Sequence, residues 1–208
     1  MRAMRNLTCA PPIDVDYIHR KVAKSKYIYI GDAGPCGLGI FAAKPFPKGA
    51  DLVVDEDGDY YDGSFSYAEV MSFGLDLATH CFQIDTDRYL LPHGSIDDLI
   101  NHACEPSAGI RLTARGYRLI ALKDIAPHEQ ITYDYSTYIA NPRERLSCGC
   151  GSPRCRGEIG PFRDLPAALR AFYLEHGVVG PFAAADAAAT HGRAPVETVL
   201  PRRRLARP

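Results

Sequence analysis

The sequence predicts a mostly β protein of the α+β class, with many short strands and few short helices. Short runs of β-prone residues recur along the 208-residue chain and are divided by some of its 18 glycines and 16 prolines. Clear helical periodicity, in contrast, is found in only two places. The length is usual for one domain with an appendage, and it is enough to bury a sizeable core.

The predicted strands are short and follow one another along most of the chain. In order, they are expected at residues 27–30, 39–42, 52–54, 80–84, 88–91, 118–122 and 130–133. There is no internal repeat. Because these strands outnumber the helical patterns, sheets are expected to form most of the core.

The first helix is predicted near residues 67–73. Ser66 and Glu69 have the S-x-x-E form of a capping box, and apolar residues follow at helical spacing. Weak apolar spacing also allows a short helix within residues 1–24.

The second helix is predicted from an apolar stripe that runs from Leu165 to Tyr173 at positions i, i+3, i+4, i+7 and i+8. Asp164 is expected to cap this helix, and Gly177 is expected to end it. From Ala183 onward the chain is rich in Ala, Pro and Arg with no useful period, which predicts a disordered tail.

These patterns divide the chain into five segments. They are an N-terminal extension at 1–24, a main domain at 25–140, a cysteine-rich segment at 141–160, a helical region at 161–182 and a disordered basic tail at 183–208. No apolar run approaches the roughly 20 residues of a membrane span, and the first residues lack the apolar stretch of a signal peptide. The reducing cytoplasm is therefore the expected location.

The formal net charge of -1 argues against a protein that binds nucleic acid over its whole surface. Charges are unevenly placed, however. An acidic run contains Asp51, Asp55, Glu56, Asp57, Asp59 and Asp62. A basic end contains Arg202, Arg203, Arg204 and Arg207. The acidic run either attracts a basic partner or is a solvated loop, and the basic end either touches nucleic acid or is a frayed tail.

Three of the seven cysteines lie within eight residues, in the run Cys148-Gly-Cys150-Gly-Ser-Pro-Arg-Cys155. In a reducing compartment such spacing predicts a metal site before disulfides. Zn²⁺ binds thiolates tetrahedrally, so a fourth ligand must come from elsewhere. No H-E-x-x-H pattern is present, which favours a structural zinc over a catalytic one. A zinc-stabilised adaptor for nucleic acid or protein stays open at this point.

Three further segments stand in chain order before the cysteine run. They read Gly37-Leu38-Gly39-Ile40-Phe41, Asn101-His102-Ala103-Cys104-Glu105-Pro106-Ser107 and Ile131-Thr132-Tyr133-Asp134-Tyr135. They resemble the G-x-G, N-H-S-C-x-P-N and L-T-[YF]-D-Y motifs of the SET-domain family of protein-lysine methyltransferases. The cysteine run resembles the post-SET segment of the same family. The resemblance covers about residues 37–157 and is closest to the small bacterial members.

The resemblance implies a β-clip of short curved sheets, with a pseudoknot in which the Asn101 segment meets the Tyr135 segment. It makes residues 25–140 the SET domain and 141–160 the post-SET zinc segment. The implied reaction transfers a methyl group from S-adenosylmethionine to a lysine amine of a protein substrate. Such a substrate is expected to be basic if the acidic run attracts it.

The resemblance also assigns residues to roles. Tyr135 is the expected catalytic phenol, and Tyr133 holds the Phe/Tyr switch position, where a tyrosine predicts mainly monomethylation. The expected cofactor-binding residues are Gly37, Leu38, Gly39, Asn101, His102 and Tyr135. The expected structural Zn²⁺ ligands are Cys104, Cys148, Cys150 and Cys155.

The sequence departs from the family pattern at four places. Ala103 replaces a serine, Ser107 replaces the final asparagine, His128 stands where a glycine is usual, and residues 55–58 lack an expected aromatic. Peptide recognition is therefore expected to be atypical. An inactive SET-like zinc module that only binds proteins is the alternative, and the intact Tyr135 argues against it.

Overall fold

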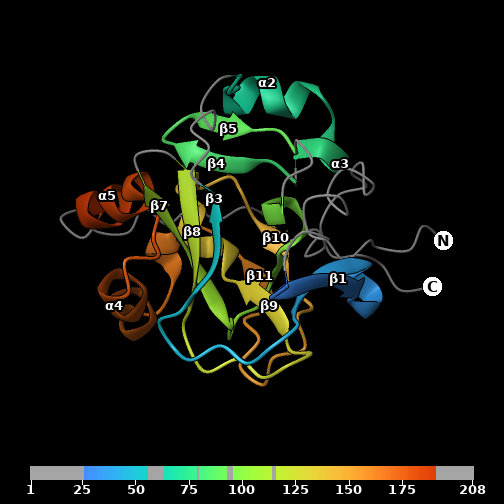
Figure 1. Cartoon of the computed structure of the whole chain (residues 1–208). Helices are drawn as coiled ribbons and strands as arrows, with labels where there is room; N and C mark the ends of the chain where they lie inside the picture. Colours follow the sequence, from blue (N-terminus) through green and yellow to red (C-terminus); the bar gives the residue numbers. More distant parts are fainter. Residues whose placement is uncertain (1–25, 56–62, 79, 93–95, 114–115, 191–208) are drawn as a thin grey trace, which may run out of the picture.

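The computed structural model describes residues 26–55, 63–78, 80–92, 96–113 and 116–190 (Figure 1). Within these ranges the chain forms eleven strands, four α-helices and four 3-10 helices, which confirms the mostly β prediction. All seven predicted strands are present, with ends that differ by at most two residues. In the same ranges no helix combines the length and the apolar character needed to cross a membrane.

The first sheet brings distant motifs together. Its strands, in spatial order, are β1 (Ile28–Asp32), β2 (Leu38–Ala42), β9 (Gln130–Tyr133) and β6 (Asn101–His102). β6 pairs in parallel with β9, so that Asn101 lies opposite Thr132 and His102 lies opposite Tyr133. Because β9 leads directly into Tyr135, the two segments that were expected to meet do so.

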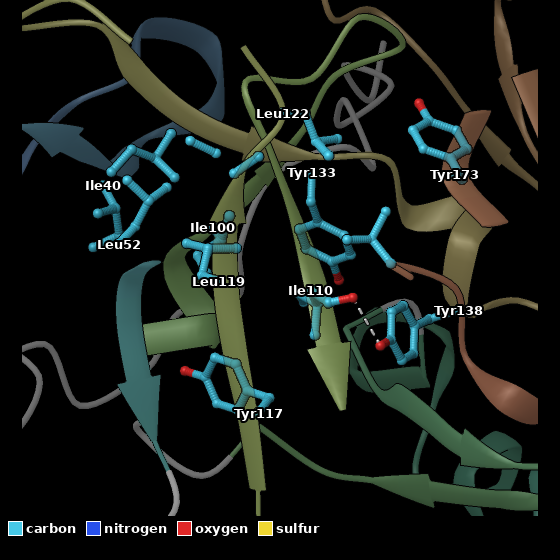
Figure 2. Close-up of a cluster of buried hydrophobic side chains, with 14 of the residues drawn as sticks. Ile40, Leu52, Ile100, Ile110, Tyr117, Leu119, Leu122, Tyr133, Tyr138 and Tyr173 are labelled. Atoms are coloured by element: carbon cyan, nitrogen blue, oxygen red, sulfur yellow. Dashed lines mark hydrogen bonds between the residues drawn. The ribbon is translucent and has the colours of Figure 1, made fainter. Parts of the chain in front are cut away.

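The second sheet supplies much of the core. Its strands, in spatial order, are β3 (Asp51–Asp55), β8 (Gly116–Ala121) and β7 (Ala108–Thr113). Ile110 and Leu119 face each other across β7 and β8, and both are almost fully buried. Figure 2 shows the hydroxyl of Tyr138 reaching the carbonyl oxygen of Ile110, at 3.0 Å. A polar tip inside the core thus has its partner.

Two smaller strand pairs and several short helices complete the fold. The pairs are β4 (Phe82–Asp85) with β5 (Arg88–Leu90), and β10 (Leu146–Ser147) with β11 (Glu158–Ile159). The 3-10 helices are η1 (Gly34–Cys36), η2 (Ile96–Leu99), η3 (Tyr135–Tyr138) and η4 (Phe162–Asp164). Figure 1 shows α2 (Tyr67–Ser72) lying beside the β4–β5 hairpin, and α3 (Leu75–Ala78) follows it.

The capping box predicted for the first helix is confirmed. The hydroxyl of Ser66 accepts the N–H of Glu69, and the Glu69 carboxylate accepts the N–H of Ser66 at 2.7 Å. These reciprocal bonds satisfy two of the N–H groups that a helix start leaves unpaired.

The second helix begins later than predicted. It is α4 (Ala167–Glu175), and its N-cap is Pro166 rather than Asp164. Asp164 instead ends η4 and pairs with Arg145. The prediction of Asp164 as cap was therefore wrong, because Pro166 favours an extended Leu165 before it and α4 can begin only after that residue. Gly177 follows the end of α4 with φ 64°, as predicted.

The start of the predicted disordered tail was also wrong. Residues Pro181–Thr190 form α5, in which Ala183 and Ala187 are buried. Alanine has the highest helix propensity, and its small side chain permits close packing that leaves no polar–apolar period to detect. The rest of the tail, the predicted helix within 1–24 and most of the acidic run lie outside the described residues.

Candidate active site and zinc centre

The G-x-G motif forms the turn that leads into β2. Gly37 has φ 73°, a conformation that glycine adopts readily. The carbonyl of Leu38 accepts the side-chain N–H of Asn101 at 3.0 Å. A Cβ on Gly39 would lie 3.0 Å from the Asn101 amide nitrogen and 2.5 Å from Nε2 of Gln130, so a side chain there would displace at least the Gln130 amide. The turn and Asn101, both expected at the cofactor, are thus in contact.

Tyr135 is held at both ends. Its N–H donates to Nδ1 of His102 at 3.2 Å, and its hydroxyl donates to the carbonyl of Ile100 at 3.0 Å. Burial lowers the pKa of His102 to about 4, although the nearby Asp134 opposes this, so the ring is neutral at pH 7 and Nδ1 is free to accept. The orientation of the phenol is therefore fixed by β6 and the residue before it.

A cavity of about 60 Å³ opens beside Tyr135. Tyr133 lines it, with its ring centroid 4.8 Å from that of Tyr135. Burial raises the pKa of the Tyr133 phenol well above its ordinary value, which keeps the hydroxyl neutral. No residue that the structure describes hydrogen-bonds this hydroxyl. The cavity thus offers one neutral, unpaired hydroxyl to whatever occupies it.

Asp134 joins the cysteine segment to the rest of the domain. Its carboxylate is almost fully buried and accepts the Arg156 guanidinium at 2.7 Å and the N–H of Ser136 at 3.1 Å. Its other oxygen accepts the hydroxyl of Tyr173, from α4, at 3.0 Å. One carboxylate therefore links three segments: η3, the end of the cysteine run and the C-terminal helical region.

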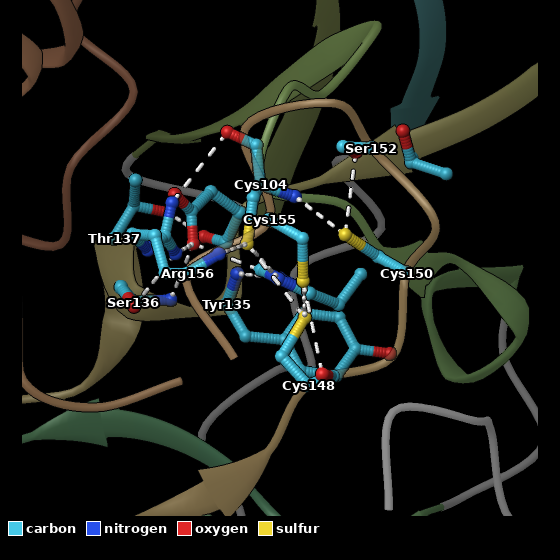
Figure 3. Close-up of polar contacts among 12 residues, drawn as sticks. Cys104, Tyr135, Ser136, Thr137, Cys148, Cys150, Ser152, Cys155 and Arg156 are labelled. Carbon is cyan, nitrogen blue, oxygen red and sulfur yellow. Dashed lines mark hydrogen bonds and ion pairs between the residues drawn. The ribbon is translucent and has the colours of Figure 1, made fainter. Parts of the chain in front are cut away.

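The cysteine thiols converge as the sequence predicts (Figure 3). Sγ of Cys148 lies 3.6 Å from Sγ of Cys104 and 3.6 Å from Sγ of Cys155. Thiolates at the corners of a zinc tetrahedron are about 3.8 Å apart, given Zn–S bonds of about 2.3 Å. Cys150 lies nearby, and its sulfur accepts the N–H of Cys104 at 3.4 Å. The donor set and its spacing fit a structural zinc.

A histidine competes with Cys155 for the fourth ligand position. The candidate ligand atoms of His102, Cys104, Cys148 and Cys150 lie within 4.8 Å of one another. Nε2 of His102 is 3.4 Å from Sγ of Cys104. The structure thus brings together three of the predicted ligands, with either Cys155 or His102 beside them.

The thiols in this cluster differ in acidity. Burial raises the pKa of Cys104 to about 11 and raises that of Cys148 further. Burial acts in the same direction on Cys150, but hydrogen bonds from the Cys104 N–H and Ser152 outweigh it and lower the pKa to about 6. Neighbouring thiols do not all ionise without a balancing cation, and a bound divalent metal supplies that balance.

Two departures from the family pattern have structural explanations. Ser107 donates to the carbonyl of Gln130 and accepts the N–H of Thr132, both at 3.0 Å, so it ties its segment to β9. His128 has φ 66°, a left-handed conformation for which glycine is the usual choice, and its ring bonds the Tyr29 hydroxyl at 3.0 Å. Nothing in the structure explains the alanine at 103.

Sequence reasoning missed several residues of the site. Asp134 and Arg156 stand inside segments that matched the family motifs, so a closer look at those positions would have found them. Gln130 and Glu144 carry no motif signal. Their positions become meaningful only when the fold places them beside Gly39 and beside the cavity.

The fold and the site together define a class of protein. Short sheets bring a G-x-G turn, an Asn-His strand and the rings of Tyr133 and Tyr135 to one place, with a thiol cluster alongside. Residues 37–136 match the family described as the SET domain. The chain therefore contains a SET domain, as its motifs predicted.

Known proteins with similar sequences are histone-lysine methyltransferases by name. Histone-lysine N-methyltransferase ATX2 of Arabidopsis thaliana is 34% identical over 152 residues, which cover 69% of this chain and 14% of that protein. The histone-lysine N-methyltransferase, H3 lysine-4 specific, of Saccharomyces cerevisiae is 34% identical over 87 residues, which cover 38% of this chain and 8% of that protein. The chain thus spans only a small part of these relatives. The small bacterial type stays a prediction.

A solved structure is similar over part of the chain. It is described as the crystal structure of KRYPTONITE in complex with mCHG DNA and SAH. The match covers 64% of this chain and 28% of that one, with 20% identity and a TM-score of 0.46.

Proposed function

We propose that this protein is a protein-lysine N-methyltransferase that uses S-adenosylmethionine. The observation that carries the proposal is that Tyr135 is hydrogen-bonded to Ile100 and His102 and lines a small cavity together with other tyrosines. Its phenol is fixed by the carbonyl of Ile100, and its main chain is fixed by His102. A rigid phenol beside a narrow cavity suits a reaction that depends on aligning two reactants.

The chemistry requires a neutral amine in a defined direction. A lysine amine has an ordinary pKa of about 10.4, so it must lose a proton before it can attack a methyl group. The cavity beside Tyr133 and Tyr135 desolvates the amine, which favours its neutral form. Tyr135 then orients the reacting groups. S-adenosylmethionine supplies the electrophilic methyl group when it is bound.

The residues around the G-x-G turn fit such a cofactor. Gly39 lacks a side chain where the amide groups of Asn101 and Gln130 converge. Nε2 of Gln130 is buried without a hydrogen-bond partner among the described residues, which is costly for a polar atom. We assign cofactor contacts to this turn, to Asn101 and to His102.

We further propose one structural Zn²⁺ held by Cys104, Cys148, Cys150 and Cys155. The 3.6 Å spacing of Cys148 from two other thiols supports this set. Bonded to zinc, the cluster would fix the loop of 148–155 against the strand that carries His102. The zinc has no part in the methyl transfer.

Monomethyl-lysine is the proposed main product. The unpaired Tyr133 hydroxyl occupies the cavity, where it or a water that it binds crowds an amine that already carries a methyl group. The proposed substrate is a protein lysine in a basic surrounding, and histones are the first candidates because the relatives bear that name. The six cysteines of the described residues form no disulfide with one another, which supports a reducing location such as the cytoplasm.

Methyl transfer from radiolabelled S-adenosylmethionine to core histones and to whole-cell lysate tests the proposal, with mass spectrometry locating the modified residues. Tyr135→Phe is the matched variant. It is expected to lower kcat by about 100-fold, while the free energy of unfolding changes by only about 1 kcal/mol through the lost bond to Ile100.

Calorimetric titration with S-adenosylmethionine separates the alternatives. Cofactor binding without transfer to any protein would identify an inactive SET-like module. A chain that holds zinc but binds no cofactor would be an adaptor, and the proposed activity would then be wrong.

A further inference from the structure

The cavity beside Tyr135 has an unusual distribution of charge. Tyr133, Tyr135 and Tyr138 form aromatic walls. The carboxyl-bearing residues that line the same cavity are Asp97, Asp98 and Glu144. No lysine or arginine lines it among the described residues. Aromatic faces and carboxylates both attract cations, so the cavity suits a cationic guest.

Among the carboxylates that line this cavity, Glu144 has a neutral phenol as its described side-chain partner. Its carboxylate accepts a hydrogen bond from the hydroxyl of Tyr89, at 3.3 Å. That hydroxyl in turn accepts a hydrogen bond from the side-chain amide of Asn141, at 3.2 Å. Within the ranges that the structure describes, Glu144 forms no ion pair. The next residue, Arg145, turns away to pair with Glu158 on the surface. Glu144 is partly buried, and a carboxylate withdrawn from water without a counter-charge is stabilised by a ligand that supplies one.

The acidity of Glu144 agrees with this geometry. Burial raises its pKa to about 7, and the Tyr89 hydroxyl opposes the shift only in part. Other glutamates behave in the opposite way: partners hold the pKa of Glu105, through Arg154, below its ordinary value. Glu144 therefore gains most from a cation that enters the cavity.

We propose that Glu144 is the specificity-determining residue that binds the ammonium group of the incoming lysine. This rests on the proposed function, since it takes the cavity beside Tyr135 to be the lysine channel. The carboxylate first attracts the charged primary amine, and the amine then loses its proton to solvent as the cavity between the tyrosine rings desolvates it. A neutral analogue of lysine, such as norleucine or acetyl-lysine, gains nothing from it.

The alternative is that Glu144 only anchors Tyr89. Tyr89 is 2% exposed and lies on β5, so a structural contact is a reasonable competitor. Tyr89→Phe removes this hydrogen bond and keeps the carboxylate, whereas Glu144→Gln removes the charge and keeps the shape. The two variants therefore separate the roles.

The test has two arms on the full chain. In the first, methyl transfer to core histones is measured for the wild type and for Glu144→Gln, Glu144→Asp, Tyr89→Phe and Glu175→Gln. In the second, nuclear magnetic resonance titration measures binding of Nα-acetyl-lysine methylamide and of its norleucine counterpart. Glu175 is exposed at the end of α4, so its variant is the matched charge control.

Glu144→Gln is expected to raise KM by about tenfold or more with kcat within a few-fold of the wild type, and to weaken lysine-amide binding similarly. Glu144→Asp should restore part of the loss, while Tyr89→Phe and Glu175→Gln should behave as the wild type. Norleucine-amide binding should not change.

Two results would overturn the proposal. One is unchanged KM and unchanged lysine-amide binding in Glu144→Gln. The other is a Tyr89→Phe variant that reproduces the full effect, which would make Glu144 an anchor. If the wild type transfers no methyl group, the proposed function fails, and the binding arm still decides whether Glu144 recognises an ammonium group.

Discussion

Two carboxylates, those of the buried Asp134 and the partly buried Glu144, occupy contrasting surroundings. Asp134 accepts hydrogen bonds from Arg156, from a backbone N–H and from Tyr173. Within the part of the chain that the structure describes, the Glu144 carboxylate accepts one hydrogen bond, from a neutral phenol, and pairs with no cation. The protein satisfies one carboxylate internally and leaves the other without its counter-charge. A carboxylate whose hydrogen bonds and counter-charge come from the protein indicates a structural junction. A carboxylate without a counter-charge indicates a binding site for a ligand.

The thiol cluster extends this comparison. Like Asp134, it would have all its partners within the protein if four protein ligands complete the coordination of one zinc ion. Cys155→Ser is expected to lower zinc from one per chain to well below one after treatment with a chelator, since thiolate ligands supply most of the binding free energy of about 10–16 kcal/mol. His102→Gln is expected to retain its zinc. Elemental analysis of purified protein measures both.

Cys81→Ser is the control for the zinc measurement. Cys81 donates to the carbonyl of Leu77 and lies outside the cluster, so its loss should leave zinc at one per chain. Zinc that persists in Cys155→Ser but disappears in His102→Gln would make histidine the fourth ligand.

Removal of the Asp134 carboxylate should lower the free energy of unfolding more than removal of an exposed carboxylate does. Asp134→Ala is expected to lower the free energy of unfolding by about 3–5 kcal/mol, because it leaves Arg156 and Tyr173 buried without their partner. Asp51→Ala is the control, since Asp51 pairs with Arg118 at an exposed position and should cost less than about 1 kcal/mol. Urea denaturation compares the two. Equal losses would show that Asp134 is not a junction.

The thiol cluster and the helix cap, whose partners lie within the protein, were largely predictable from the sequence. The thiols of Cys148, Cys150 and Cys155 are close in the chain, and the capping box of Ser66 is a local pattern. Such features depend on short-range geometry, which sequence spacing encodes. Cys104 was found only through its motif, because it lies far from the other thiols in sequence.

The residues around the cavity beside Tyr135 could not be predicted to lie together, because they come from segments that are distant in the sequence. Glu144 follows η3, its partner Tyr89 lies on β5, and Asp97 lies on η2. No local spacing connects these residues. β7 was missed for a related reason: its first three residues, from Ala108, are all buried, so the strand shows no alternation of polar and apolar residues.

The Glu144 carboxylate, which has no counter-charge among the described residues, predicts that the free energy of unfolding depends on pH. The folded pKa of Glu144, about 7, lies above its ordinary 4.5, so its contribution is present at pH 4 and is lost as the pH rises to about 7. Glu144→Gln does not titrate. Its stability relative to the wild type should therefore increase between pH 5 and pH 8, by about 1 kcal/mol, since part of the side chain remains solvated and the full shift would correspond to about 3 kcal/mol.

The cavity has other titratable groups, which must be matched in this comparison. They are His80, Cys81, Asp97, Asp98, Tyr133, Tyr135 and Tyr138, with Tyr89 behind Glu144. Because each is present in both proteins, the difference between the two pH profiles isolates Glu144. Parallel profiles from chemical denaturation at each pH would show that Glu144 is already compensated.

The smallest expected effect concerns the Tyr133 hydroxyl, which has no hydrogen-bond partner among the described residues. Tyr133→Phe removes one hydroxyl and frees space for about one water, ~30 Å³, which is enough for an added methyl group. The first transfer should proceed at nearly the wild-type rate, because Tyr135 and Glu144 remain. Later transfers should become faster, since a methylated amine then has room to turn its lone pair toward the donor. Mass spectrometry of a single-lysine peptide should show mainly monomethyl-lysine for the wild type and more di- and trimethyl-lysine for the variant. A wild type that readily reaches trimethyl-lysine would show that crowding by Tyr133 does not limit the product, and that the cavity distinguishes its guests by charge alone.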